Sequence, residues 1–319
     1  MSPLNDSISC LLPVRNGERY LNRLLPRILS MLKDKDDFII INDGSEDSSR
    51  RIIEEYSSRD PKIKLINTEG VGLVNALNLG IQTSKNNWIA RFDVDDLYSD
   101  QRLADQRKLI AEDVSVIFSD YNFISSSGKS LGVIHSAISP SASSLALISG
   151  QRSAHPVALI NRQLLLECGG YKVDDFPVED LALWLRISRF GKIVSAPSVL
   201  LHYQLSIGSI SASSRKIQLM KKAEFIRAYD AWPFLVTQSL SNFSQTVTLY
   251  KSSPNSWERL FLHVRDLLIA KKLVGFDVPV IRLLNDLGVL ATVRLILVGI
   301  KMFSWVFIRR IYRITRTGF

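Results

Sequence analysis

Apolar and polar positions alternate along the first 135 residues with two periods, one typical of strands and one typical of helices. Short apolar runs predict five strands, at Ile8–Pro13, Asp37–Asn42, Lys62–Asn67, Asn87–Phe92 and Val114–Ser119. Apolar residues at helical spacing predict four helices between them, over Gly17–Leu32, Glu46–Arg59, Val71–Thr83 and Gln101–Glu112. Because the connections are short, the pattern predicts an α/β fold with a mostly parallel sheet and helices on both faces.

The pattern becomes less regular beyond this region. It predicts a hairpin over Tyr121–Ile134, a short helix over Pro140–Ile148, an amphipathic helix over Pro177–Phe190, short strands over Lys192–Ser195 and Val199–Tyr203, and a helix over Arg215–Ala231. We therefore divide the chain into an α/β domain (residues 1–212), a helical linker region (213–260) and a basic, apolar helical tail (261–319).

Polar clusters fall where three of the predicted strands end. They are Arg15-Asn16-Gly17, Asn42-Asp43-Gly44-Ser45 and the acidic run from Asp93 to Asp96. In open α/β sheets, ligands bind at the carboxyl ends of the strands. The three clusters therefore predict a ligand site at one edge of the sheet.

The acidic run has the composition of a site for a hard metal ion. Asp93, Asp95 and Asp96 follow an apolar strand, with no His or Cys beside them. Such oxygen ligands suit Mg²⁺ or Mn²⁺ better than zinc, and substrate phosphates commonly complete the coordination. The alternative is an acidic turn that caps a helix starting near Asp100.

Two further segments carry candidate chemistry. The Asp43 carboxylate could accept a hydrogen bond from a nucleotide base, or Asp43 and Ser45 could simply cap the next helix. Glu179 and Asp180 stand at the start of the helix over Pro177–Phe190, where either could act as a general base or serve only as an N-terminal cap. His155 lines the site in one interpretation and is a hydrogen-bonded structural histidine in the other.

Composition narrows the class of protein. Of the 319 residues, 46% are hydrophobic and 22% charged, which is typical of a globular protein. Cys10 and Cys168 are the only cysteines and stand in no metal-binding pattern, so they indicate a reducing compartment. Because residues 1–9 show no secretory signal, we expect a cytoplasmic catalytic part.

The positive charge is concentrated in the tail. Residues 261–319 hold ten Lys/Arg and three Asp out of a net charge of +9 for the whole chain. Leu287–Ile308 is apolar except for Arg294, Lys301 and small polar residues. We expect residues 287–319 to lie on an anionic membrane surface at the inner face of the cell membrane, and we expect no nucleic-acid partner. A membrane-spanning helix, or a helix packed on protein, are the alternatives.

The ordered set of motifs resembles the inverting family 2 glycosyltransferases with the GT-A fold. The resemblance runs from about Ile8 to Ser211. It is carried by the opening loop and helix from Pro13 to Leu21, by Asn42-Asp-Gly-Ser45, by the helix over Leu73–Gly80, by the metal-binding Asp-x-Asp pattern Asp93-Val-Asp95 and by Glu179-Asp180.

This resemblance implies a donor, a metal and a reaction. The donor is a nucleotide-diphospho-sugar, with UDP favoured and GDP or dTDP open, and the acceptor is a glycan or a lipid-linked hydroxyl. The implied donor contacts are Pro13, Arg15, Asn16, Asp43, Asn75, Asp93 and Val94. Asp93 and Asp95 hold Mn²⁺ or Mg²⁺, Asp180 (or, less favoured, Glu179) is the catalytic base, and Asp96 and His155 contact donor sugar or acceptor.

The chain departs from the family pattern in three places. Asn42 replaces a common Asp, and Tyr203-Gln-Leu-Ser206 lacks the Arg and His of the family's Tyr-Arg-x-His stretch, which puts a diphosphate contact there in doubt. No Gln-x-x-Arg-Trp motif occurs, which favours addition of one sugar per event over processive synthesis.

Two other functions fit the same sequence less well. A catalytically degenerate scaffold would bind nucleotide sugar or a partner without turnover, and the intact acidic pairs argue against it. A sugar-phosphate nucleotidyltransferase would carry a Gly-rich, basic loop after the first strand, which Pro13-Val-Arg-Asn-Gly17 matches poorly.

Overall fold

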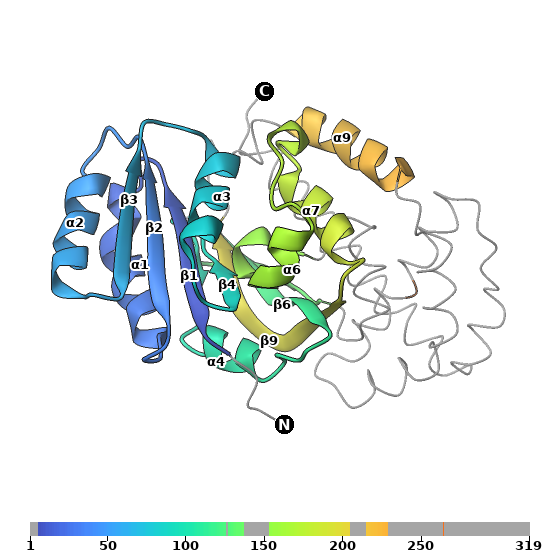
Figure 1. Ribbon diagram of the computed structural model, residues 1–319, viewed down its shortest axis with the longest axis horizontal. Coiled ribbons are helices and arrows are strands. Elements are labelled where there is room, and N and C mark those ends of the chain that lie inside the picture. The colour runs from blue at the N-terminus through green and yellow to red at the C-terminus, as the bar shows by residue number, and fades with distance from the viewer. Residues whose placement is uncertain (1–5, 126, 137–152, 205–214, 229–263, 265–319) are drawn as a thin grey trace.

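The computed structural model describes residues 6–125, 127–136, 153–204, 215–228 and 264. The described strands form one nine-stranded sheet in the order β3-β2-β1-β4-β8-β6-β9-β5, with β7 paired to β6 (Figure 1). This arrangement confirms the predicted α/β fold class.

The first half of the sheet is parallel. It contains β1 (Ile8–Val14), β2 (Asp37–Asp43), β3 (Ile63–Thr68) and β4 (Trp88–Arg91). The helices between them are α1 (Glu18–Met31), α2 (Ser49–Arg59) and α3 (Leu73–Thr83). Helix α3 lies in front of the sheet in Figure 1 and α1 lies behind it, so apolar side chains of β1 and β2 are buried from both sides.

The second half of the sheet is mixed. It contains β5 (Leu97–Tyr98), β6 (Val114–Ile124), β7 (Ser130–Ile134), β8 (Leu159–Asn161) and β9 (Lys192–Gln204). Strand β8 is antiparallel to both β4 and β6, whereas β6 and β9 are parallel. The remaining helices are α4 (Arg102–Arg107), α6 (Arg162–Glu167), α7 (Glu179–Ile187) and α9 (Arg215–Ala228), with single 3-10 turns at His155–Val157 and Val173–Asp175.

Two strands are longer than the sequence pattern predicts. Strand β6 continues five residues past Ser119, and all of its residues are buried. The carboxylate of Asp120 is accommodated inside because it accepts hydrogen bonds from the Ser136 backbone N–H (2.8 Å) and pairs with His135 Nδ1 (2.8 Å). Strand β9 joins the two short strands that were predicted separately.

The boundaries of two predicted helices were wrong. Helix α2 begins at Ser49 and not at Glu46, and the Asp47 carboxylate just before it accepts a hydrogen bond from the Ser49 N–H (2.9 Å). Helix α4 is confined to Arg102–Arg107 and so is half the predicted length. The predicted helix over Pro140–Ile148, most of the linker region (all but 215–228) and the tail apart from residue 264 lie outside the described residues.

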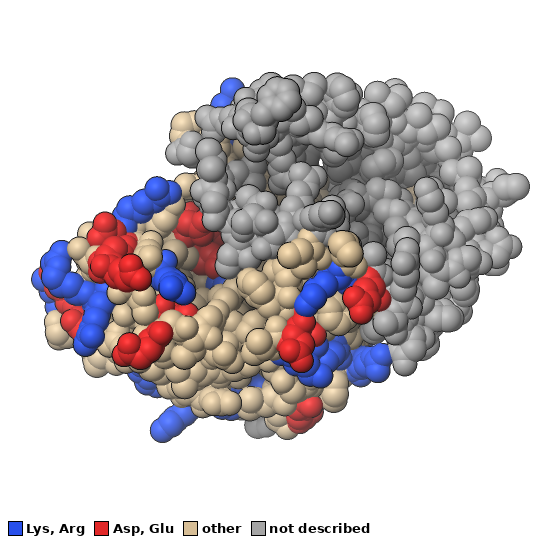
Figure 2. All heavy atoms as spheres, turned by 90° about the horizontal axis from the view of Figure 1, so that it is seen from above, with Lys and Arg blue, Asp and Glu red and all other residues tan. Residues whose placement is uncertain are grey.

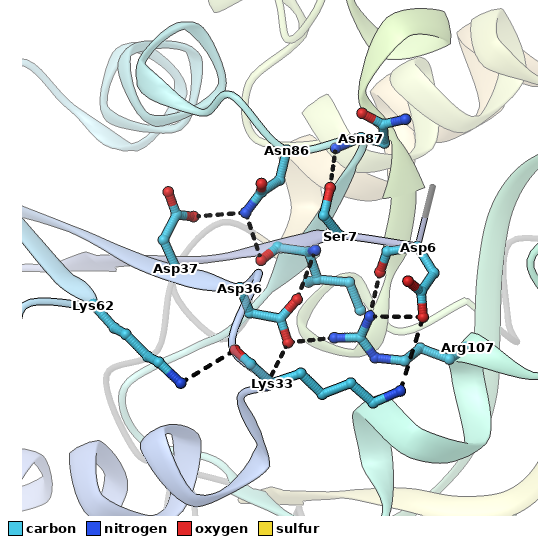
Figure 3. Close-up of polar contacts among 10 residues, drawn as sticks. Asp6, Ser7, Lys33, Asp36, Asp37, Lys62, Asn86, Asn87 and Arg107 are labelled. Atoms are coloured by element: carbon cyan, nitrogen blue, oxygen red, sulfur yellow. Dashed lines mark hydrogen bonds and ion pairs between the residues drawn. The ribbon is translucent and has the colours of Figure 1, made fainter. Parts of the chain in front are cut away.

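Buried charge fixes the end of the sheet where β1 begins (Figure 3). The Asp36 carboxylate accepts hydrogen bonds from the backbone N–H of Ile8 (2.9 Å) and Lys33 (2.7 Å), and it forms an ion pair with Arg107 of α4. Arg107 also pairs with Asp6. This network joins β1, the α1–β2 turn and α4, and it leaves the opposite edge of the sheet for a ligand.

Candidate active site

The loops after β1 and β2 are joined by a reciprocal set of hydrogen bonds. The Asn16 N–H donates to Ser45 Oγ (3.0 Å), and the Asn16 side-chain oxygen accepts from the Glu46 N–H (2.8 Å). Asp47 accepts from the Glu18 N–H (3.0 Å). Asn16 has φ 53°, a conformation in which Asn is tolerated better than most residues. The first two polar clusters therefore lie side by side, as the strand-end rule predicts.

Asp43 is buried and holds the loop that leads into α3. One carboxylate oxygen accepts from the Val71 N–H (2.6 Å) and the Thr68 hydroxyl (2.7 Å), and the other accepts from the Gly72 N–H (2.9 Å). These bonds lead to α3 and not to α2, so the alternative in which Asp43 and Ser45 cap α2 was wrong. A carboxylate has about four acceptor positions. With three of them used, Asp43 keeps one for a ligand N–H.

The acidic run forms a tight turn between β4 and β5. Arg91, almost fully buried, donates from Nη2 to Asp93 Oδ1 (2.7 Å). The Tyr98 hydroxyl accepts a hydrogen bond from the Asp93 N–H (2.6 Å). Val94 packs on the loop after β1, since a side chain added at Gly17 would meet Val94 Cγ2 at 2.8 Å. The third polar cluster thus contacts the first.

Asp96 faces inward and not toward solvent. One of its carboxylate oxygens accepts from the Gln204 N–H at the end of β9 (2.9 Å), and the other has no partner among the described residues. Burial, with the charges of Asp93 and Asp95, raises the pKa of Asp96 well above its ordinary value. Asp96 therefore joins the acidic turn to β9.

The buried guanidinium of Arg102 packs against two aromatic rings beside this turn. The Arg102 guanidinium lies over the Phe92 ring at 3.8 Å and over the Tyr98 ring at 4.8 Å. It also donates to the carbonyl oxygen of Arg91 (2.6 Å). Burial lowers the pKa of Arg102 to about 10, so the group remains charged at neutral pH.

The second acidic centre lies at the N-terminus of α7. Glu179 is buried, and its Oε2 has no partner among the described residues. Burial, followed by the charge of Asp180, raises the pKa of Glu179 to about 7. Burial also raises the pKa of Asp180, while the charge of Lys222 opposes that rise. The Leu181 N–H donates to Asp180 Oδ1 (2.7 Å).

The charge of the first acidic centre acts on the second. The charge of Asp93 contributes to the raised pKa of Glu179, and the charge of Arg91 acts in the opposite direction on the pKa of both Glu179 and Asp180. Residues almost 90 positions apart in the chain therefore share one electrostatic environment.

His155 lies beside Tyr171 and the α7 residue Trp184. Its Nε2 is 2.7 Å from the Tyr171 hydroxyl, and its ring packs at 5.8 Å from the Trp184 ring of α7. Burial, and to a smaller extent the Arg91 charge, lowers the pKa of His155 well below its ordinary value, so the imidazole is neutral.

The two asparagines of α3 have different surroundings. Asn78 clamps the loop before α7, because its amide donates to the Tyr171 carbonyl oxygen (2.8 Å) and accepts from the Tyr171 N–H (3.0 Å). Asn75 is exposed, and its amide donates to the Val71 carbonyl oxygen two residues before the helix begins (2.9 Å). Sequence reasoning missed this clamp, since an Asn inside a helix gives no sign of a contact 93 residues away.

The oxygen atoms at the acidic turn fit a hard divalent cation in part. Among the described residues no group of three or more His, Cys, Asp or Glu side chains is arranged to hold a metal ion. Asp93 and Asp95 supply two carboxylates, and Arg91 orients the Asp93 carboxylate through Oδ1. Mg²⁺ and Mn²⁺ are commonly held by one or two carboxylates together with water and substrate phosphates. The chemistry of these two side chains is therefore compatible with such an ion.

Sequence relatives agree on the class of protein. The family described as Glycosyl transferase family 2 matches residues 9–151. An uncharacterized glycosyltransferase of Haemophilus influenzae is 28% identical over 220 residues, covering 66% of this chain and 83% of the relative. Glycosyltransferase GlyA of Streptococcus pneumoniae is 34% identical over 93 residues, which are 29% of this chain and only 13% of that longer protein.

Solved structures agree on the fold. Staphylococcus aureus TarS 1-349 in complex with UDP-GlcNAc has a TM-score of 0.59 at 16% identity, covering 84% of this chain and 82% of that one. Mannosyltransferase PcManGT from Pyrobaculum calidifontis, in complex with GDP-Man and Mn²⁺, has a TM-score of 0.57 at 16% identity, covering 92% and 86%. Residues 9–151 therefore match glycosyl transferase family 2, and the described α/β domain has the GT-A fold.

Proposed function

We propose that this protein transfers a single sugar from a nucleotide-diphospho-sugar, with UDP favoured, to a hydroxyl of a glycan or lipid-linked acceptor, with inversion at the anomeric carbon. The observation that carries the proposal is that the charge of Asp93, in the turn after β4, contributes to the raised pKa of Glu179 at the start of α7. Structural neighbours that bind UDP-GlcNAc or GDP-Man and Mn²⁺ support the donor class and the metal.

The donor would lie across the joined loops after β1, β2 and β4. Asp43 would accept a hydrogen bond from the nucleotide base with its remaining acceptor position. Pro13, Arg15, Asn16, Asn75 and Val94 line the same edge or the helix beside it and are the proposed further donor contacts. Asp93 and Asp95 would hold Mn²⁺ or Mg²⁺, which offsets the charge that develops on the leaving diphosphate.

Asp180 would take the proton of the acceptor hydroxyl. As that proton leaves, the hydroxyl oxygen forms a bond to the anomeric carbon and the bond from that carbon to the diphosphate oxygen breaks. A carboxylate whose pKa is raised by burial is a stronger base than an exposed Asp, which suits this role. Glu179 is the alternative base. Asp96 and His155 would shape the sugar-binding part of the site from the buried side.

The test is release of nucleoside diphosphate and glycosylated product from a panel of nucleotide sugars with Mn²⁺. We expect Asp180→Asn to lose at least about a hundredfold in kcat, the contribution typical of a general base. Asp95→Asn should also lose activity, because the proposed metal ion would lose a ligand. Asp174→Asn is the matched control, because this exposed carboxylate lies just before α7. Wild-type activity in Asp180→Asn would refute its role. Donor binding by the native protein without any turnover would establish the scaffold alternative instead.

We further propose that residues 287–319 place the enzyme on an anionic membrane surface at the cytoplasmic face. The support is the basic, apolar composition of the tail. No helix within the described residues is long and apolar enough to cross a bilayer. Sedimentation with anionic liposomes should require residues 287–319, and binding that persists after their deletion would contradict the proposal.

A further inference from the structure

The backbone of Asp93 is held by a side chain and not by the sheet. The Phe92 N–H still donates to the Leu11 carbonyl oxygen of β1 (2.9 Å). One residue later, the Asp93 N–H donates instead to the Tyr98 hydroxyl (2.6 Å), and that hydroxyl donates to the Asp93 carbonyl oxygen (3.2 Å). The Tyr98 hydroxyl therefore closes the turn that carries Asp93 and Asp95.

The ring of Tyr98 is fixed independently of its hydroxyl. Tyr98 is fully buried in β5, where it pairs with Leu201 of β9. Its ring packs edge-on against the Phe92 ring, with 4.7 Å between the ring centroids, and the Arg102 guanidinium lies 4.8 Å from its own centroid. The hydroxyl takes no part in these contacts. A Phe at this position would therefore keep the packing and lose only the two bonds to Asp93.

The carboxylate of Asp93 is held by a second buried group. The Arg91 side chain, which is 2% exposed, donates from Nη2 to Asp93 Oδ1 (2.7 Å) and from Nη1 to the Phe92 carbonyl oxygen. The Asp93 side chain is 33% exposed, and its Oδ2 accepts no hydrogen bond from any other described residue. One carboxylate oxygen is thus bonded to the protein, and the other is left for a ligand.

We propose that Tyr98 and Arg91 are positioning residues that hold Asp93 ready to bind the divalent cation. The inference rests on the proposed function, because the cation is part of it. Like charges on Asp93 and Asp95 repel each other in the ion-free protein, which favours arrangements unsuited to binding. Restraint of the Asp93 backbone and of one carboxylate oxygen reduces the ordering that the ion would otherwise have to impose. Groups that orient metal ligands in this way typically change metal affinity by about 10- to 100-fold.

The first test measures Mn²⁺ binding without turnover. Folded wild type and variants are titrated with Mn²⁺, alone and with a fixed concentration of UDP, and free Mn²⁺ is followed by electron paramagnetic resonance against a protein-free titration. We expect Tyr98→Phe to raise the dissociation constant of Mn²⁺ about tenfold. Arg91→Lys should also raise it, because Lys keeps the charge but not the planar pair of donors. Tyr56→Phe, which removes a hydroxyl from a partly buried ring of α2, is the matched control and should leave the constant unchanged.

A second measurement separates positioning from a merely structural role. In transfer assays the Mn²⁺ concentration that gives half-maximal rate should rise about tenfold in Tyr98→Phe. The kcat at saturating Mn²⁺ should stay within about twofold of wild type, because excess ion restores occupancy of the site.

The outcomes distinguish this inference from the proposed function. Loss of Mn²⁺ binding in Asp95→Asn, with an unchanged dissociation constant in Tyr98→Phe, would overturn the inference alone. An equal rise in Tyr98→Phe and Tyr56→Phe would also overturn it. Wild-type Mn²⁺ binding in Asp95→Asn would overturn the proposed metal site, and the positioning roles of Tyr98 and Arg91 with it.

Discussion

Replacement of Glu179 by Gln should make the protein more stable at alkaline pH. Glu179 is buried at 6% exposure, and its pKa is raised from an ordinary value of 4.5 to about 7. In the unfolded chain this carboxyl loses its proton near pH 4.5, whereas the native protein keeps it until about pH 7. Between these values the native state binds more protons, so the free energy of unfolding falls as the pH rises.

The size of the effect follows from the same two values. The difference between the ordinary and the native-state pKa of Glu179 corresponds to roughly 3 kcal/mol. This contribution to the stability of the native state is fully present below pH 4.5 and fully lost above pH 7. Gln has the same shape and no charge to bury. The variant should therefore match the wild type near pH 4.5 and exceed its stability at pH 8 by up to about 3 kcal/mol.

The assay is urea denaturation of metal-free protein at a series of pH values. Only the difference between variant and wild type is interpreted, because other groups titrate in both proteins. Glu112→Gln, at an exposed position before β6, is the control and should change stability by less than about 0.5 kcal/mol at every pH. A difference between Glu179→Gln and wild type that does not grow with pH would refute the reasoning.

Two further predictions concern side chains that hold loops of the site. Asn78→Ala should lower the free energy of unfolding by about 1–3 kcal/mol, because both Tyr171 backbone groups lose a partner. Asn75→Ala should lower it by less than about 1 kcal/mol. Chemical denaturation of both variants checks this, and equal losses would contradict it. Asp43→Asn should lower the free energy of unfolding of the ligand-free protein by about 1–3 kcal/mol, because an amide group can accept hydrogen bonds on only one of its two sides. Calorimetry is the assay, and unchanged stability would mean that the contacts with Val71 and Gly72 are dispensable.

The sequence predicted the parts of the fold that depend on local pattern. Strands β1 to β4 and helices α1 and α3 follow from the spacing of apolar residues, and the strand-end rule correctly joined the loops containing Asn16 and Asp43. The full length of β6 was not predictable, since Asp120 resembles the end of a strand until its contacts with His135 and Ser136 are known.

Some site residues were hidden for the same physical reason. Arg91 reads as an ordinary position of β4, and only the fold shows that its charge reaches Asp93 and the start of α7. Which side chains act across the sheet depends on tertiary contacts, and the local spacing of apolar residues does not predict those contacts.

Charge on the described surface agrees with the distribution seen in the sequence. On the face shown in Figure 2, Lys and Arg side chains alternate with Asp and Glu, and the described residues there form no large patch of either sign. The cations concentrated in residues 261–319 account for most of the net charge of +9. The proposed attraction to an anionic membrane would therefore come from the tail and not from this face of the α/β domain.

The central claim is that the Asp93 turn and the start of α7 form one site for a nucleotide sugar and a divalent cation. Its most direct test is the thermal stability of wild type, Asp95→Asn and Asp180→Asn with nucleotide sugars, with and without Mn²⁺, because a ligand that binds only the native state raises its melting temperature. The account predicts a Mn²⁺-dependent rise in wild type and Asp180→Asn that disappears in Asp95→Asn. An equal rise in all three proteins, independent of Mn²⁺, would contradict it.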